Sequence, residues 1–157
     1  MILNGHDYLD MPPLGPKLFS LLTSSFSLRN QEKYAQSFLN NLWTFDDGLS
    51  SILMADQVLF SPFDLKFSFF ISPYLIDAYH NGDSSFVADR LQCYNSQILS
   101  WDSIHYLIAM GHTIGLHGYD HTNYSLMSEA QIIDQHECSL NLLYQRLGIT
   151  TKLFALP

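Results

Sequence analysis

The sequence has few positive charges and no long apolar run. Lys and Arg together number 7 against 15 Asp and Glu in 157 residues, which gives a formal net charge of −8. This balance excludes a basic surface that could neutralise phosphates, so we expect no nucleic-acid partner. No stretch reaches the ~18 apolar residues that a membrane-spanning helix needs. We therefore expect no membrane partner either.

The cysteines and the N-terminus limit the expected compartment. Cys93 and Cys138 match no metal-ligand spacing and make no disulfide framework. The first residues, from Met1 to Asp7, lack the basic and apolar regions of a secretory signal peptide. We therefore expect a cytoplasmic protein.

The composition predicts one globular α/β domain behind a short lead-in. Hydrophobic residues make up 47% of the chain and charged residues 14%, which is typical of a packed core. Residues 1–38 are broken by early prolines and are interpreted as a lead-in segment, with the folded domain at 39–157. Strands are expected at 42–46, 65–72, 113–116 and 151–156, and the main helices at 50–59, 101–110 and 129–147. Strands separated by helices favour a parallel sheet or barrel.

Two adjacent carboxylates follow the first of these strands. In the run Leu-Trp-Thr-Phe-Asp-Asp-Gly, Asp46 and Asp47 follow the apolar residues and Gly48 ends the strand. Successive side chains of a strand point to opposite faces, so one carboxylate can take a metal while the other faces a substrate or a water. The alternative is that Asp47-Gly48 is only a turn that closes the strand.

Two histidines follow the strand at 113–116. His117 and His121 lie four residues apart, and their imidazoles converge if the residues between them make one helical turn or a tight loop. With a carboxylate from the other strand end they form an Asp-His-His set that leaves positions for water and substrate, as a catalytic zinc requires. A His-x-x-x-His pair alone is weak evidence, but two strand-end motifs in this order indicate a metal site.

Both motifs carry a family resemblance. Residues 44–48 and 117–121 resemble the first two signature motifs of the polysaccharide deacetylases, the metal-dependent carbohydrate esterases (family 4) that share the NodB homology domain. The one departure is Gly118, which stands where the family usually has Ser or Thr. The resemblance implies that Asp46 is the general base and that Asp47, His117 and His121 bind the metal. It implies no particular substrate-binding residue.

The resemblance also implies the fold, a distorted seven-stranded (β/α) barrel. We expect a partial barrel here, truncated after about four strands and incomplete at the C-terminus. Residues 154–157 resemble the opening of the third family motif, with Ala155 where many members have an arginine that braces the catalytic Asp. No residue matches the later histidine that acts as general acid in the family.

The function implied is that of a metal-dependent hydrolase. It would remove acetyl groups from N-acetylated or O-acetylated carbohydrate, acting on carbon–nitrogen bonds other than peptide bonds. Zn²⁺ is the preferred ion, and Co²⁺, Ni²⁺ or Mn²⁺ also suit imidazole and carboxylate ligands. Two alternatives stay open: a remnant that binds metal or sugar without turnover, and an unrelated α/β domain with structural Asp and His residues. The glycan and the oligomeric state are not predicted.

Overall fold

The chain folds around a parallel sheet. In the computed structural model, the described residues are 2–5, 42–92 and 97–157. Four strands are hydrogen-bonded in the order β1-β2-β3-β4, and each neighbouring pair is parallel. The strands are β1 (Ile2–Gly5), β2 (Leu42–Phe45), β3 (Ser68–Ile71) and β4 (Thr113–Leu116). The α/β class and the partial barrel agree with the sequence prediction.

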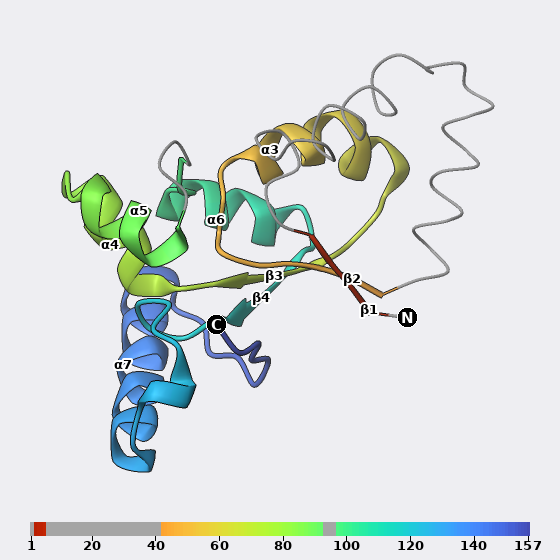
Figure 1. The fold of residues 1–157 in the computed structure, drawn as a ribbon. Helices are drawn as coiled ribbons and strands as arrows, with labels where there is room; N and C mark the ends of the chain where they lie inside the picture. The colour runs from red at the N-terminus through yellow and green to blue at the C-terminus, as the bar shows by residue number, and fades with distance from the viewer. Residues whose placement is uncertain (1, 6–41, 93–96) are drawn as a thin grey trace.

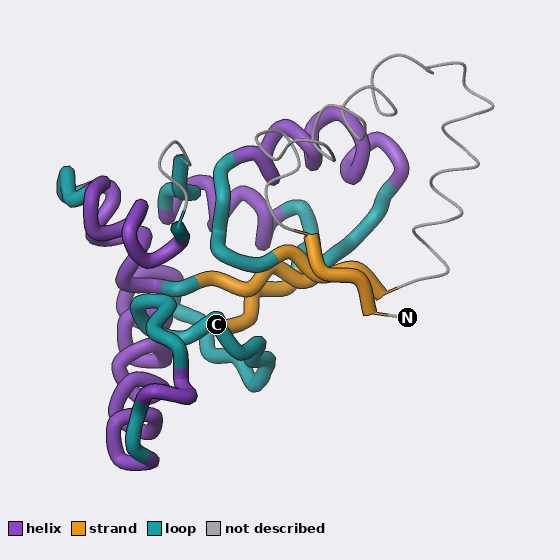
Figure 2. The backbone as a smooth tube through the Cα atoms, in the orientation of Figure 1, coloured by secondary structure: helices purple, strands orange, loops and turns teal. Residues whose placement is uncertain are grey.

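Helices cover both faces of the sheet. The α-helices are α3 (Ser51–Ala55), α4 (Pro73–His80), α5 (Ser84–Leu91), α6 (Trp101–Ala109) and α7 (Glu129–Leu147). Helices α3 and α6 lie on one side of the sheet, and α7 lies on the other (Figures 1 and 2). The α4–α5 hairpin lies beyond the end at which β3 finishes (Figure 1). Among the described residues, no helix is both long and apolar enough to cross a bilayer.

The predicted helix ends are set by local capping. At the start of α7, the Gln131 N–H donates to Ser128 Oγ at 3.4 Å, and the Ser128 N–H donates to Gln131 Oε1 at 2.9 Å. This reciprocal pair is a capping box, for which Ser followed three residues later by Gln is the sequence signature. Helix α7 ends at Gly148, whose φ of 68° is the left-handed conformation that glycine adopts without strain.

Three of the four predicted strands differ from the structure. The first ends at Phe45 rather than at residue 46, and the second is Ser68–Ile71 rather than residues 65–72. Residues 151–156 form no strand, because their pairing with the sheet is limited to one parallel bridge between Phe154 and Leu116. Leu116 is the last residue of β4, so the segment meets the sheet only where β4 finishes.

The helix predicted at 50–59 changes its winding halfway. After α3, the chain continues as a π-helix, η1 (Asp56–Phe60), and a 3₁₀ turn, η2 (Ser61–Phe63). A second 3₁₀ turn, η3 (Tyr124–Leu126), precedes α7. Single π turns are uncommon inside helices and are not encoded by the 3.6-residue periodicity on which the prediction rested.

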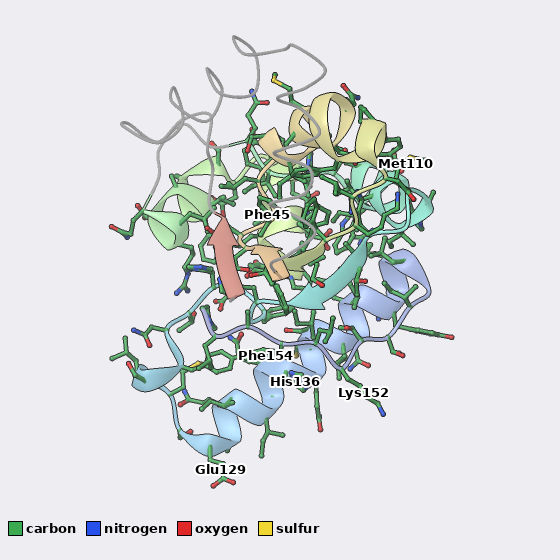
Figure 3. The ribbon with its side chains drawn as sticks, turned by 90° about the vertical axis from the view of Figure 1, so that its right-hand side faces the viewer. Phe45, Met110, Glu129, His136, Lys152 and Phe154 are labelled. Carbon is green, nitrogen blue, oxygen red and sulfur yellow. The ribbon has the colours of Figure 1, made fainter. Side chains whose placement is uncertain are left out.

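Aromatic rings fill the core on the α3 side of the sheet. Phe60 and Phe67 lie 4.4 Å apart between ring centroids, and Phe45 lies 5.5 Å from Phe69. On the opposite side, the ring of His136 lies 5.6 Å from that of Phe154 (Figure 3). His136 is half-buried and packs as a residue of α7.

Strand β1 was not predicted. Ile2–Gly5 pairs in parallel with β2 along its full length, so the first residues of the lead-in belong to the sheet. The rest of the predicted lead-in lies outside the described residues. The boundary between residues 38 and 39 therefore stays a prediction.

Candidate metal centre

The ends of three parallel strands bring the two sequence motifs together. Strand β3 lies between β2 and β4, so the residues that follow Phe45 and Leu116 reach the same edge of the sheet. The His117 N–H donates to the Ile71 carbonyl at 2.8 Å, and Ser72 Oγ donates to the His117 carbonyl at 2.6 Å. The backbone of His117 is thereby held against the end of β3. Parallel sheets commonly place functional residues at this carboxyl edge.

The two carboxylates leave β2 through a left-handed turn. Asp47 has φ of 70° and Gly48 has φ of 72°, so the strand alternation expected for Asp46 and Asp47 does not continue through Asp47. A Cβ at Gly48 would lie 3.3 Å from Ile71 Cγ2. Glycine at position 48 therefore permits both the positive φ and the close approach to β3. The Asp-Asp-Gly run is a turn, but one that aims a carboxylate at the histidines.

Asp47 and the two histidines converge on one point. The Nε2 atoms of His117 and His121 lie 3.3 Å and 3.1 Å from the same oxygen, Asp47 Oδ1. One ligand atom from each of the three residues lies within 4.8 Å of the others, and this is the single group of this kind among the described residues. The side chains are 5%, 21% and 12% exposed for His117, His121 and Asp47. The three side chains are thus largely buried but still partly accessible to solvent.

The second nitrogen of His117 is also held. Its Nδ1 lies 3.2 Å from the carbonyl oxygen of Ala155. A carbonyl oxygen only accepts, so Nδ1 carries the hydrogen and, in the neutral ring, Nε2 presents a lone pair toward Asp47. A lone pair and a carboxylate oxygen repel each other unless a cation lies between them. Metal-binding histidines typically donate their other N–H to a carbonyl or carboxylate in this way.

Asp46 takes a different position. Its side chain does not belong to the three-residue group, and the residue is only 4% exposed. Its Oδ1 is buried and accepts no hydrogen bond from the described residues. A buried carboxylate oxygen without a donor is costly, so a proton, a water or a cation is expected beside it. These observations fit a divalent ion held by Asp47, His117 and His121, with Asp46 outside that set.

Comparison with known proteins identifies the family. The family model for polysaccharide deacetylases matches residues 41–157. The chain belongs to the polysaccharide deacetylase family. No curated protein sequence matches the chain significantly.

Solved deacetylase structures share the fold at low sequence identity. IcaB from Ammonifex degensii is 17% identical with a TM-score of 0.71, and the match covers 100% of this chain and 73% of that one. The Streptococcus pyogenes deacetylase PplD, solved in complex with acetate, is 15% identical with a TM-score of 0.64, over 98% and 71%. A de-N-acetylase from Aggregatibacter actinomycetemcomitans is 12% identical with a TM-score of 0.62, over 99% and 78%.

The departure of this deacetylase-family chain at Gly118 has a structural reason. Gly118 has φ of 74°, and a Cβ there would lie 3.2 Å from Pro157 Cγ and 3.7 Å from the Tyr124 hydroxyl. The position therefore needs glycine for its backbone as well as for space. Burial, and then the negative charge of Asp120, raises the pKa of Tyr124 above its ordinary value of 10.0. The phenol against Gly118 is thus neutral.

The structure contains a second carboxylate–imidazole pair that sequence reasoning missed. His112 Nε2 lies 2.9 Å from Asp56 Oδ1, and both side chains are fully buried. The Phe67 N–H donates to His112 Nδ1 at 3.2 Å, so the hydrogen of His112 is on Nε2 and points to Asp56. Tyr106 Oη donates to Asp56 Oδ2 at 2.9 Å, and Ser61 Oγ donates to the same carboxylate at 3.0 Å. No motif or regular spacing in the sequence links His112 to the other residues of this cluster, so the pair could not be predicted from the sequence.

Proposed function

We propose that this chain is a metal-dependent deacetylase acting on acetylated carbohydrate. The observation that carries the proposal is the convergence of two imidazole nitrogens on Asp47 Oδ1, with His117 Nδ1 tied to a carbonyl. Membership of the polysaccharide deacetylase family supports the reaction class, and the acetylated sugar is the substrate that follows from it. Zn²⁺ is the proposed ion, because one carboxylate and two imidazoles suit it.

Each residue of the site has a separate part in the proposal. Asp47, His117 and His121 hold the ion, which when bound polarises the acetyl carbonyl and lowers the pKa of the attacking water. Asp46 takes the proton of that water through its buried Oδ1, which has no donor among the described residues. The water oxygen then bonds to the acetyl carbon. The bond to the sugar nitrogen or oxygen breaks as that atom gains the proton that Asp46 took from the water, passed directly or through solvent, and acetate is released.

The first experiment separates binding from turnover. Zinc is titrated into the chelator-treated chain by calorimetry, and acetate release is then measured with chitin oligosaccharides and with an O-acetylated xylan. We expect about one zinc ion per chain and acetate release that depends on it. No binding by the folded chain would contradict the proposal at its first step.

The variant Asp46→Asn separates the base from the metal ligands. We expect zinc affinity close to that of the unaltered chain and a loss of about 10²–10⁴ in rate, typical of a missing general base. Zinc binding without acetate release in the unaltered chain would favour the second candidate, a binding remnant without turnover.

A further inference from the structure

The α4–α5 hairpin contacts the loop between the two candidate histidine ligands. The Tyr74 N–H, at the start of α4, donates to the Tyr119 carbonyl at 2.9 Å. The rings of these two tyrosines are stacked, with centroids 5.1 Å apart and an interplanar angle of 25°. The first half of the loop is therefore held by α4.

The second half of the loop is held by Arg90 of α5. Arg90 Nη2 lies 3.2 Å from Asp120 Oδ2, and Arg90 Nη1 donates to Thr122 Oγ1 at 2.8 Å. Thr122 in turn donates to Asp120 Oδ1 from its hydroxyl at 2.7 Å and from its N–H at 3.2 Å. Arg90, Asp120 and Thr122 thus form a closed set of hydrogen bonds, here called the Arg90 clamp, that spans His121.

His121 depends on support from outside its own backbone. Its φ of 60° lies in the left-handed region, which costs a non-glycine residue roughly 1–2 kcal/mol. Its side chain makes no hydrogen bond to a carbonyl of the kind that orients His117, as far as the described residues show. The residues on each side of His121 are the two that Arg90 holds.

We propose that Arg90 is a positioning residue for His121, an inference that rests on the metal site proposed above. The guanidinium presents its nitrogens in a rigid fork, so one side chain can hold Asp120 and Thr122 at once. Arg90 also lies over the Phe86 ring of α5, 4.9 Å from its centroid, which fixes the direction of the fork. A lysine would keep the charge but lose the two-point contact.

Electrostatics and positioning predict opposite changes in metal affinity for the variant Arg90→Ala. Removing a positive charge near a bound divalent cation strengthens the binding of that cation by Coulomb's law. Removing the clamp frees His121 and weakens the binding. Outer-shell partners of metal ligands typically contribute about 10–100-fold in affinity, so the second effect is expected to dominate.

The test compares Arg90→Ala, Arg90→Lys and Arg146→Ala in the full chain. Arg146 is the matched control, because it also donates to a carboxylate, Asp77 Oδ2, at 2.7 Å, but this contact joins α7 to α4 and includes no residue of the loop. Zinc affinity is measured by calorimetry and the ligand field by the visible absorption of bound Co²⁺. Circular dichroism of each metal-free variant reports folding.

We expect Arg90→Ala to bind zinc at least about tenfold more weakly, with a changed Co²⁺ spectrum, and Arg90→Lys to fall between it and the unaltered chain. Arg146→Ala should match the unaltered chain. Unchanged or tighter binding by Arg90→Ala would overturn the proposal.

If Arg90→Ala does not fold, Arg90→Lys decides by the same two readouts. If the unaltered chain binds no metal, the proposed function fails, and that result is distinct from normal binding that is insensitive to Arg90.

Discussion

In the part of the chain that the structure describes, carboxylates meet imidazoles at two places, over similar distances but with different hydrogen-bond partners. In the core, Asp56 and His112 lie 2.9 Å apart, and at the sheet edge Asp47 and His121 lie 3.1 Å apart. The core carboxylate receives three side-chain donors, and both nitrogens of His112 are engaged. At the edge, two Nε2 atoms meet one oxygen and Asp46 Oδ1 accepts nothing from the described residues.

The difference lies in which hydrogen-bonding groups are satisfied by the protein itself. A buried charge whose partners are all supplied is a structural element, and breaking it is costly. A cluster that concentrates acceptors around one point needs a cation or protons to be stable. Residue type alone does not separate the two cases. Four variants test this contrast.

Asp47→Ala should have the largest effect, and only on metal binding. Loss of an outer-shell partner typically weakens metal binding about 10–100-fold, and loss of a ligand should weaken it more. Calorimetry with zinc measures this change. The free energy of unfolding without metal should change less than in a variant of the core pair, because the Asp47 and His121 side chains are 12% and 21% exposed and the groups left behind can be hydrated. The exposed Asp134→Ala is the control, and a large loss of metal-free stability in Asp47→Ala would show that the edge pair is structural too.

His112→Ala should have the reverse effect. It removes one partner of a fully buried pair, which typically costs about 3–5 kcal/mol of the free energy of unfolding, measured by urea denaturation. Zinc affinity of the fraction that remains folded should be unchanged. His105→Ala, on the exposed face of α6, is the matched control. Equal stability of the two variants would contradict a structural role for the core pair.

Gly118→Ala should cost less, and it has a matched control in Gly82→Ala. Both glycines have positive φ, so both variants should lose roughly 1–2 kcal/mol of unfolding free energy from backbone strain. Only at Gly118 would the new Cβ meet another group, Pro157 Cγ at 3.2 Å, whereas nothing lies within 4 Å at Gly82. The loss should therefore be larger at Gly118. Equal losses would show that Pro157 moves aside freely.

Tyr106→Phe should have the smallest effect, and that effect should depend on pH. The hydrogen bond to Asp56, and then burial, raises the pKa of Tyr106 above 10.0 in the folded chain. The folded chain holds this proton more tightly than the unfolded chain, so the stabilisation is fully present below pH ~10 and is lost as the pH rises through the folded pKa. Denaturation at pH 7 and pH 11 should show a smaller difference from the unaltered chain at pH 11. The exposed Tyr144→Phe should show no such trend.

Local sequence was sufficient for the elements whose limits are set by their own residues. Helix α7 begins and ends where Ser128, Gln131 and Gly148 predict, and β4 spans the predicted four residues. The order of strands and helices also predicted the parallel sheet, because parallel strands need crossover connections. Since the strands are parallel, the two motifs had to reach one edge, and the candidate site could be predicted as a set.

Tertiary structure decided the features that depend on distant residues. The carbonyl that orients His117 comes from Ala155, and the arginine that holds the ligand loop comes from α5. The partner of His112 is Asp56, which points inward from a π-helical turn that no periodicity encodes. By itself the sequence determined the family, the fold class and the residues that converge at the sheet edge. Which carboxylate–imidazole pair is complete depends on hydrogen bonds across the fold, and these exist only once the chain has packed.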